Sequence, residues 1–395
     1  MTAFALALAA LLAAAPPQPS GSPAGPCPDC GLREIRIDSK VLGEVRVARV
    51  RLPEGYEGRA GRFPVIYVLD GPEHLDFTAA TAAYLARQGL MPPVLVVSVQ
   101  NVDRDRDFTP SRVTSGTRAR ATSGGADRFL RFLREELFPA VNGNLRTERF
   151  RILSGHSLGG LFALHVLATA PEAFDAYLAA SPSAEWDDSL VVKELARRLQ
   201  EPGRLDRSLY ASLGDEKEML PGFEALRAAL RSASPEGFRW DAARFPGDAH
   251  GVVPLPTTIH GLRFTFDGYL WPVDPDTGRY RGTLEDLEAH YGKLSSRLGF
   301  EVPPPEGTVN LLGYQFLREA RIGQALAAFQ ANVRLHPGSA NAHDSLGEAL
   351  EAAGRLADAA AAYERAIELG EAAGSRFLPE YRRHLRAVQR KLSQP

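Results

Sequence analysis

A serine in this sequence has the setting of a nucleophile. Ser157 lies in Gly-His-Ser-Leu-Gly, between an apolar run at 150–153 that predicts a buried strand and an apolar run at 161–167 that predicts a helix. At such a strand-to-helix turn a serine hydroxyl is exposed, and the free N–H groups of the helix start point toward it. We expect glycine at 155 and at 159 because a Cβ there would strike the neighbouring strand and helix.

A serine hydroxyl needs a base, and the base needs an acid to orient it. The chain order serine, acid, histidine selects His250, which lies in a loop after the last predicted strand. His260 is the alternative base, whereas His165 is expected to pack inside the helix that follows Ser157.

The acid is expected directly after the predicted strand 208–213. Asp215, Glu216 and Glu218 all lie there, and the sequence does not choose between them. We favour Glu216.

Two backbone N–H groups should stabilise the oxyanion of an attacked carbonyl. One is expected from Leu158, the residue after the serine, and the other from the loop after strand 63–69. Pro72 has no N–H, so the second donor must be Gly71 or Glu73. We expect Gly71.

These residues need a sheet to position them. Alternating apolar residues at 32–37 and 41–52 predict antiparallel edge strands, and apolar runs at 63–69 and 93–99 predict buried parallel strands. The remaining expected strands are 174–180, 207–213 and 238–245, with helices at 78–88, 125–141 and 220–230. This alternation predicts an α/β fold with a mostly parallel sheet, helices on both faces, and a ligand site at the carboxyl ends of the strands.

Composition narrows the class of protein. The 395 residues carry a net charge of −2 and no basic stripe with interleaved aromatics, which argues against nucleic-acid binding. Residues 1–26 resemble a signal peptide and flexible linker, so we expect export and no membrane span. Cys27 and Cys30 fit a local disulfide better than a zinc or redox site, and no cofactor or metal is expected.

As a set, the motifs resemble the putative esterase family of α/β-hydrolases, which includes enterochelin-esterase-like proteins, esterase D and the bacterial mycolyltransferases. The resemblance covers about residues 33–270. It rests on Leu69-Asp70-Gly71, Arg104 with Asp107-Phe108-Thr109-Pro110, Gly155 to Gly160, Ser181-Pro182-Ser183 with Trp186, and Gly247 to Pro254.

The resemblance implies a hydrolase of acyl esters with Ser157 as nucleophile and His250 as base, and an acid in the loop that holds Glu216. It also implies a substrate site formed by Asp70, Arg104, Asp107, His156 and Trp186. Relatives have a non-proline residue after the Asp-Gly pair, so Pro72 is a departure at the second oxyanion donor.

A repeat is expected after the linker Pro303-Pro304-Pro305. Leu312-Gly313 and Phe329 are matched 34 residues later by Leu346-Gly347 and Tyr363, a spacing typical of tetratricopeptide repeats. We expect a hydrolase domain at 27–300 and helical repeats at 306–395, which bind a protein partner, self-associate or only pack.

Ester hydrolysis of a small molecule is the favoured function. The same triad permits acyl transfer to an alcohol, and an inactive hydrolase domain that serves as a scaffold for the repeats is the third hypothesis. The sequence does not name the ester.

Overall fold

The computed structural model describes residues 31–57, 61–116, 119–233 and 235–394. The chain forms two compact units. The sheet unit comprises Asp29–Leu270 with Leu298–Phe300, and the helical unit comprises Trp271–Arg297 with Glu301–Pro395. The expected signal peptide and the cysteine pair lie outside the described residues.

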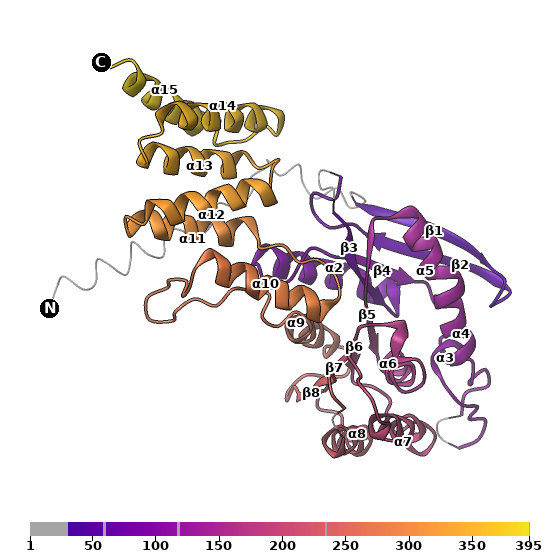
Figure 1. The fold of residues 1–395 in the computed structure, drawn as a ribbon. Helices are drawn as coiled ribbons and strands as arrows, with labels where there is room; N and C mark the ends of the chain where they lie inside the picture. Colours follow the sequence, from indigo (N-terminus) through magenta and orange to yellow (C-terminus); the bar gives the residue numbers. More distant parts are fainter. Residues whose placement is uncertain (1–30, 58–60, 117–118, 234, 395) are drawn as a thin grey trace. The chain divides into compact units, whose positions relative to one another are not determined.

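An eight-stranded sheet forms the centre of the sheet unit, in the order β1-β2-β4-β3-β5-β6-β7-β8 (Figure 1). β1 pairs antiparallel with β2, and β2 pairs antiparallel with β4, whereas all later pairs are parallel. The strands are β1 (Leu32–Ser39), β2 (Glu44–Arg51), β3 (Phe63–Val68), β4 (Leu95–Val99), β5 (Thr147–His156), β6 (Ala176–Ala180), β7 (Ser208–Leu213) and β8 (Arg239–Arg244). The expected α/β fold with a mostly parallel sheet is confirmed.

Helices cover both faces of this sheet (Figure 1). α2 and α9 pack against each other on one face, and α6 packs with α7 and α4 on the other. Their bounds are α2 (Gly71–Arg87), α3 (Arg104–Phe108), α4 (Ala126–Phe132), α5 (Phe138–Asn144), α6 (Leu158–Thr169), α7 (Trp186–Gln200), α8 (Leu220–Ser232) and α9 (Pro254–Thr265). Every residue of β3, β4, β6 and β7 is buried, and these strands are accordingly apolar apart from Ser98, Ser208 and Ser212.

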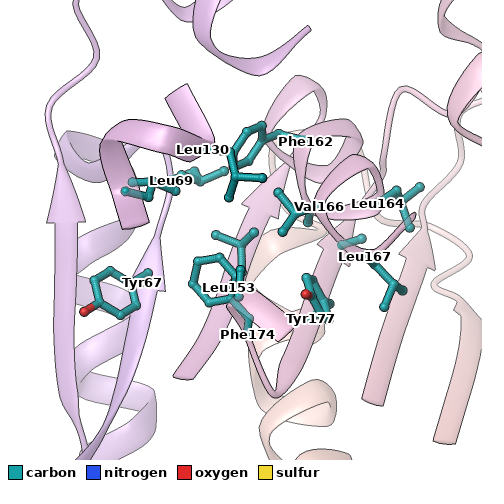
Figure 2. Close-up of a cluster of buried hydrophobic side chains, with 14 of the residues drawn as sticks. Tyr67, Leu69, Leu130, Leu153, Phe162, Leu164, Val166, Leu167, Phe174 and Tyr177 are labelled. Carbon is teal, nitrogen blue, oxygen red and sulfur yellow. The ribbon is translucent and has the colours of Figure 1, made fainter. Parts of the chain in front are cut away.

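The main core lies between the sheet and α6. Figure 2 shows Leu153 and Tyr177 on the strands beside Val166 and Leu167 of α6. The Tyr67 ring packs instead with the rings of Phe138 and Phe174. Apart from His165 and Thr169, α6 is apolar on every side, and eleven of its twelve residues are buried. A helix enclosed in this way is held in place by packing on all sides, which fixes the turn at its start.

Helical segments differ from the sequence expectation in several places, and α7 and α9 were not expected at all. α2 begins at Gly71 instead of residue 78, and the loop after β4 contains α3. The expected single helix at 125–141 is α4, a π-helical turn at Leu133–Leu137, and α5. Pro139, which has no N–H to donate, follows this π turn.

The helical unit contains six helices among its described residues. They are α10 (Leu284–Leu298, whose last residue groups with the sheet unit), α11 (Glu306–Arg318), α12 (Ile322–Leu335), α13 (Ala340–Ala352), α14 (Leu356–Ala372) and α15 (Leu378–Leu392). The compact sheet unit reaches Leu270, whereas the expected boundary lay at residue 300, because α10 and the segment before it group with the later helices. No described helix has the length and apolarity to span a membrane.

Candidate active site

Ser157 lies at a strained turn between β5 and α6. Its φ is 58° and its ψ is −114°, a backbone conformation that costs free energy for any residue other than glycine. Its N–H donates to the Ala180 carbonyl (3.0 Å), and its carbonyl accepts from the N–H groups of Leu161 (2.9 Å) and Ser183 (3.1 Å). The surrounding backbone therefore holds the serine in this conformation.

Two glycines make this turn possible, but they are not both the expected ones. A Cβ on Gly155 would lie 2.2 Å from the carbonyl oxygen of Gly159, and a Cβ on Gly160 would lie 2.9 Å from Cα of Pro182. At Gly159 the nearest atoms are 3.4 Å away, a close but possible contact. The expectation is confirmed at Gly155 and wrong at Gly159, because the tight approach to the next strand falls on Gly160.

Glu216 and His250 form an ion-pair contact between Oε1 and Nδ1. The other carboxylate oxygen, Oε2, accepts from the Gly214 N–H (2.7 Å) and the Ser181 hydroxyl (2.8 Å). The Glu216 side chain is only 10% exposed, so this carboxylate stays in one orientation. Of the three expected carboxylates, the structure brings Glu216 to His250.

The alternatives have other positions. Asp215 accepts from the Gly247 N–H (2.7 Å), and Glu218 is exposed. His260 is exposed on α9 beside Phe245. His165 is buried in α6, where its Nε2 contacts Asp127 (2.7 Å), as expected for a packing histidine.

The two N–H groups that we expect to act as oxyanion donors lie at helix starts. Leu158 is the first residue of α6 and Gly71 the first of α2, and neither N–H has an acceptor in the described part of the chain. The N–H of Glu73 donates to the Asp70 carbonyl (3.1 Å), so of the two expected alternatives only the Gly71 N–H is available as a donor. Pro72 occupies the second helical position, where an N–H is not needed.

Asp70 and Arg104 join the ends of β3 and β5. Arg104 donates from Nε to Asp70 Oδ1 (2.7 Å), from Nη2 to Asp70 Oδ2 (3.0 Å), and from Nη2 to the His156 carbonyl (3.0 Å). Asn101 also donates to Asp70 Oδ1 (2.6 Å). Sequence reasoning missed these contacts, because they join residues more than 30 positions apart and no local pattern indicates them.

Asp107 and Trp186 are almost fully buried, which does not fit the expected contact with a substrate. Asp107 pairs with the buried Arg46 and with Arg106 (2.8 Å). Trp186 is 3% exposed and donates its indole N–H to Ser111 (3.0 Å). We therefore assign both to the support of the loops around the site.

His156 lies between two other histidines. Its ring centroid is 4.2 Å from that of His250 and 5.7 Å from that of His74. Burial, with a smaller contribution from the neighbouring His250 and His74, lowers the pKa of His156 to about 4, whereas Asp70 opposes the shift. Its Nε2 is buried without a hydrogen-bond partner among the described residues. His156 is therefore neutral near pH 7.

The histidine at 156 should make folding sensitive to acid. In the unfolded chain its pKa is about 6.5, so between about pH 6.5 and 4 the unfolded state binds more protons, and stability falls as pH falls. We expect His156→Phe, which keeps a ring but removes the titration, to reduce the fall in the unfolding midpoint between pH 7 and 5, on the order of a few degrees. The measurement is thermal unfolding at both pH values.

His260→Phe is the matched control for that experiment because His260 is exposed. If the unfolding midpoint fell equally between pH 7 and 5 in His156→Phe and in the wild type, His156 would not be the source of the acid sensitivity.

One group in the described chain has metal-ligand chemistry, and it lies in the helical unit. Atoms of Asp344, Glu348 and His384 lie within 4.8 Å of one another. Each already has a protein partner: His384 contacts Asp344 (2.9 Å), and Glu348 accepts from the Tyr314 hydroxyl (2.7 Å). These contacts account for the group without an ion.

Comparison with known proteins places the chain in a family. A family model described as putative esterase matches residues 39–220. Over 233 residues the chain is 30% identical to the ferri-bacillibactin esterase BesA of Bacillus subtilis (strain 168), a match that covers 51% of this chain and 78% of the relative. The chain belongs to the putative esterase family.

Two further proteins are similar to parts of this chain. The siderophore triacetylfusarinine C esterase of Aspergillus fumigatus is 33% identical over 168 residues, which cover 38% of this chain and 56% of that protein. The crystal structure of an IroE-like serine hydrolase from Shewanella oneidensis aligns with a TM-score of 0.67 and 26% identity, over 77% of this chain and 99% of that one. Membership supports ester hydrolysis in general terms.

Proposed function

We propose that this protein is a serine esterase in which Ser157 is the nucleophile, His250 the base and Glu216 the acid. The contact between Glu216 and His250 carries the proposal, because the two groups are 34 residues apart and come from different loops at the carboxyl ends of strands. Ser157 lies at the same edge of the sheet, after β5. Membership in an esterase family supports the same chemistry.

The arrangement accounts for each proton. Glu216 accepts the Nδ1–H of His250, so Nε2 is free to take the proton of Ser157 as its oxygen attacks the ester carbonyl. The N–H groups of Leu158 and Gly71 donate to the oxyanion that forms. His250 then gives the proton to the leaving alcohol, and a water molecule activated by His250 releases the acid from the acyl-enzyme.

We propose that the ester belongs to the siderophore class, because named relatives act on ferri-bacillibactin and on triacetylfusarinine C. The test is a panel of p-nitrophenyl esters of increasing chain length beside a siderophore trilactone with and without bound iron. We expect release of the monomeric acid from the trilactone. If only the p-nitrophenyl esters were hydrolysed, the esterase proposal would stand and the siderophore proposal would fail. If no ester were hydrolysed, both proposals would fail.

We also propose that α11 to α14 form two tetratricopeptide-like repeats. Supporting contacts recur at a spacing of 34 residues: a Cβ on Gly313 would lie 2.6 Å from the Phe329 ring, and one on Gly347 would lie 2.5 Å from the Tyr363 ring. Such repeats commonly bind partner proteins or pack against further repeats.

The glycine at 347 should be essential for packing in this region. A methyl group there meets the ring of Tyr363, which is fully buried, so Gly347→Ala should lower the free energy of unfolding by about 1–3 kcal/mol. Gly338→Ala is the control, since no atom lies within 4 Å of its Cβ position. Chemical denaturation of the full chain measures the free energy of unfolding of both variants. Equal losses in Gly347→Ala and Gly338→Ala would contradict the predicted contact.

A further inference from the structure

The side chain of Arg104 connects the two turns that carry the oxyanion donors. It holds the Asp70 carboxylate through two hydrogen bonds and the His156 carbonyl through a third. Asp70 directly precedes Gly71, and His156 is two residues before Leu158. One guanidinium therefore spans the distance between the backbone segments that present the two N–H groups.

Both of those segments have strained backbones. Asp70 has a φ of 55° and Ser157 a φ of 58°, in the left-handed region that residues with a side chain rarely occupy. β3 and β5 are adjacent in the sheet, with Val68 opposite Ser154, so the two turns leave neighbouring strands. A strained turn relaxes unless its surroundings hold it, and Arg104 contacts both turns.

Arg104 is itself held from behind. It is the first residue of α3, and the next turn of that helix carries Asp107, which pairs with Arg46 of β2. Both partners of this pair are almost fully buried. The Arg104 guanidinium lies 5.5 Å from the ring centroid of Phe108, which is also buried. A planar guanidinium with a fixed fork is suited to such a two-sided contact, whereas lysine is not.

We propose that Arg104 is a positioning residue that sets the separation of the Gly71 and Leu158 N–H groups. This inference rests on the proposed esterase function. It replaces the expectation that Arg104 binds substrate, since three of the five N–H groups of its guanidinium already point at Asp70 and His156. Its effect should therefore appear in the transition state and not in substrate binding.

The test compares Arg104→Gln and Arg104→Lys with the wild type on an uncharged p-nitrophenyl ester. We expect kcat to fall about 10²–10³-fold in both, the loss typical of one oxyanion donor, with KM little changed. Arg112→Gln is the matched control, because Arg112 is exposed in the segment that follows α3 and the variant removes the same charge. A raised KM with kcat retained would show that Arg104 binds substrate, and unchanged kcat and KM would also overturn the proposal.

A second measurement separates positioning from loss of fold. A trifluoromethyl ketone forms a tetrahedral adduct with the serine, whose negative oxygen depends strongly on the oxyanion donors. A non-hydrolysable amide analogue of the substrate keeps a neutral, planar carbonyl that depends on them far less. In Arg104→Lys we expect affinity for the ketone to fall far more than affinity for the amide. Equal losses, or none, would overturn the inference. Failure of the esterase proposal is distinct, because the wild type would then show neither turnover nor ketone binding.

Discussion

Ser157→Ala is expected to lower ester turnover by about 10⁴-fold or more, because without the hydroxyl no acyl-enzyme forms and only the oxyanion donors and substrate binding remain. The fold should persist. The Ser157 backbone makes three hydrogen bonds that alanine retains, although alanine must also adopt the φ of 58°. Steady-state turnover and labelling by a fluorophosphonate measure the effect, with thermal unfolding as the check on folding.

Ser183→Ala is the control for the serine experiment. Its backbone N–H donates to the Ser157 carbonyl, so the variant removes a nearby hydroxyl and leaves that contact in place. We expect it to be labelled and to turn over ester at close to the wild-type rate. If Ser157→Ala were labelled as fast as the wild type, another residue would be the nucleophile and the proposed mechanism would fail.

Glu216→Gln should have the next largest effect, a loss of about 10⁴-fold in kcat, because a neutral amide neither holds the same histidine tautomer nor stabilises the imidazolium. Asp215→Asn and Glu218→Gln are the matched controls. Each removes one negative charge from the same loop, yet Asp215 contacts the Gly247 N–H and Glu218 is exposed. Both should keep most of the activity.

The three carboxylate variants are compared by their kcat values on the same soluble ester, and the variant with the lowest kcat identifies the acid of the triad. Glu216→Asp adds a second test, since it keeps the charge but shortens the side chain that reaches His250. We expect the kcat of Glu216→Asp to lie between that of the wild type and that of Glu216→Gln. If Glu218→Gln were the most damaging substitution, the assignment of the acid would be wrong although a triad mechanism would stand.

Much of the fold could be predicted because burial leaves its pattern in the chain. Strands enclosed on both faces are mostly apolar, so β3 and β4 could be predicted from their apolar runs. The alternation in β1 and β2 indicated strands at a sheet edge with one covered face. α3 was missed because a helix of five residues is too short for apolar periodicity. The break in the helix at 125–141 was also missed, although Pro139 lies inside that range and lacks the N–H that a continuous helix needs.

The sequence by itself determined the residue types at the site and their place along the chain. Ser157 follows a strand and precedes a helix, and these local features depend only on neighbouring residues. The tertiary structure decided which groups meet. Glu216 is distinguished from Asp215 and Glu218 only because its side chain faces His250.

The tertiary structure also decided which residues hold the site in place. Asp107 was an expected substrate contact, yet it lies buried against Arg46, which is 61 residues away in the chain. Arg104 meets the carbonyl of His156 across 52 residues. Such contacts join segments that come together only when the sheet is assembled. A hydrogen bond depends on distance and direction in space, and the order of residues along one strand does not specify either across strands.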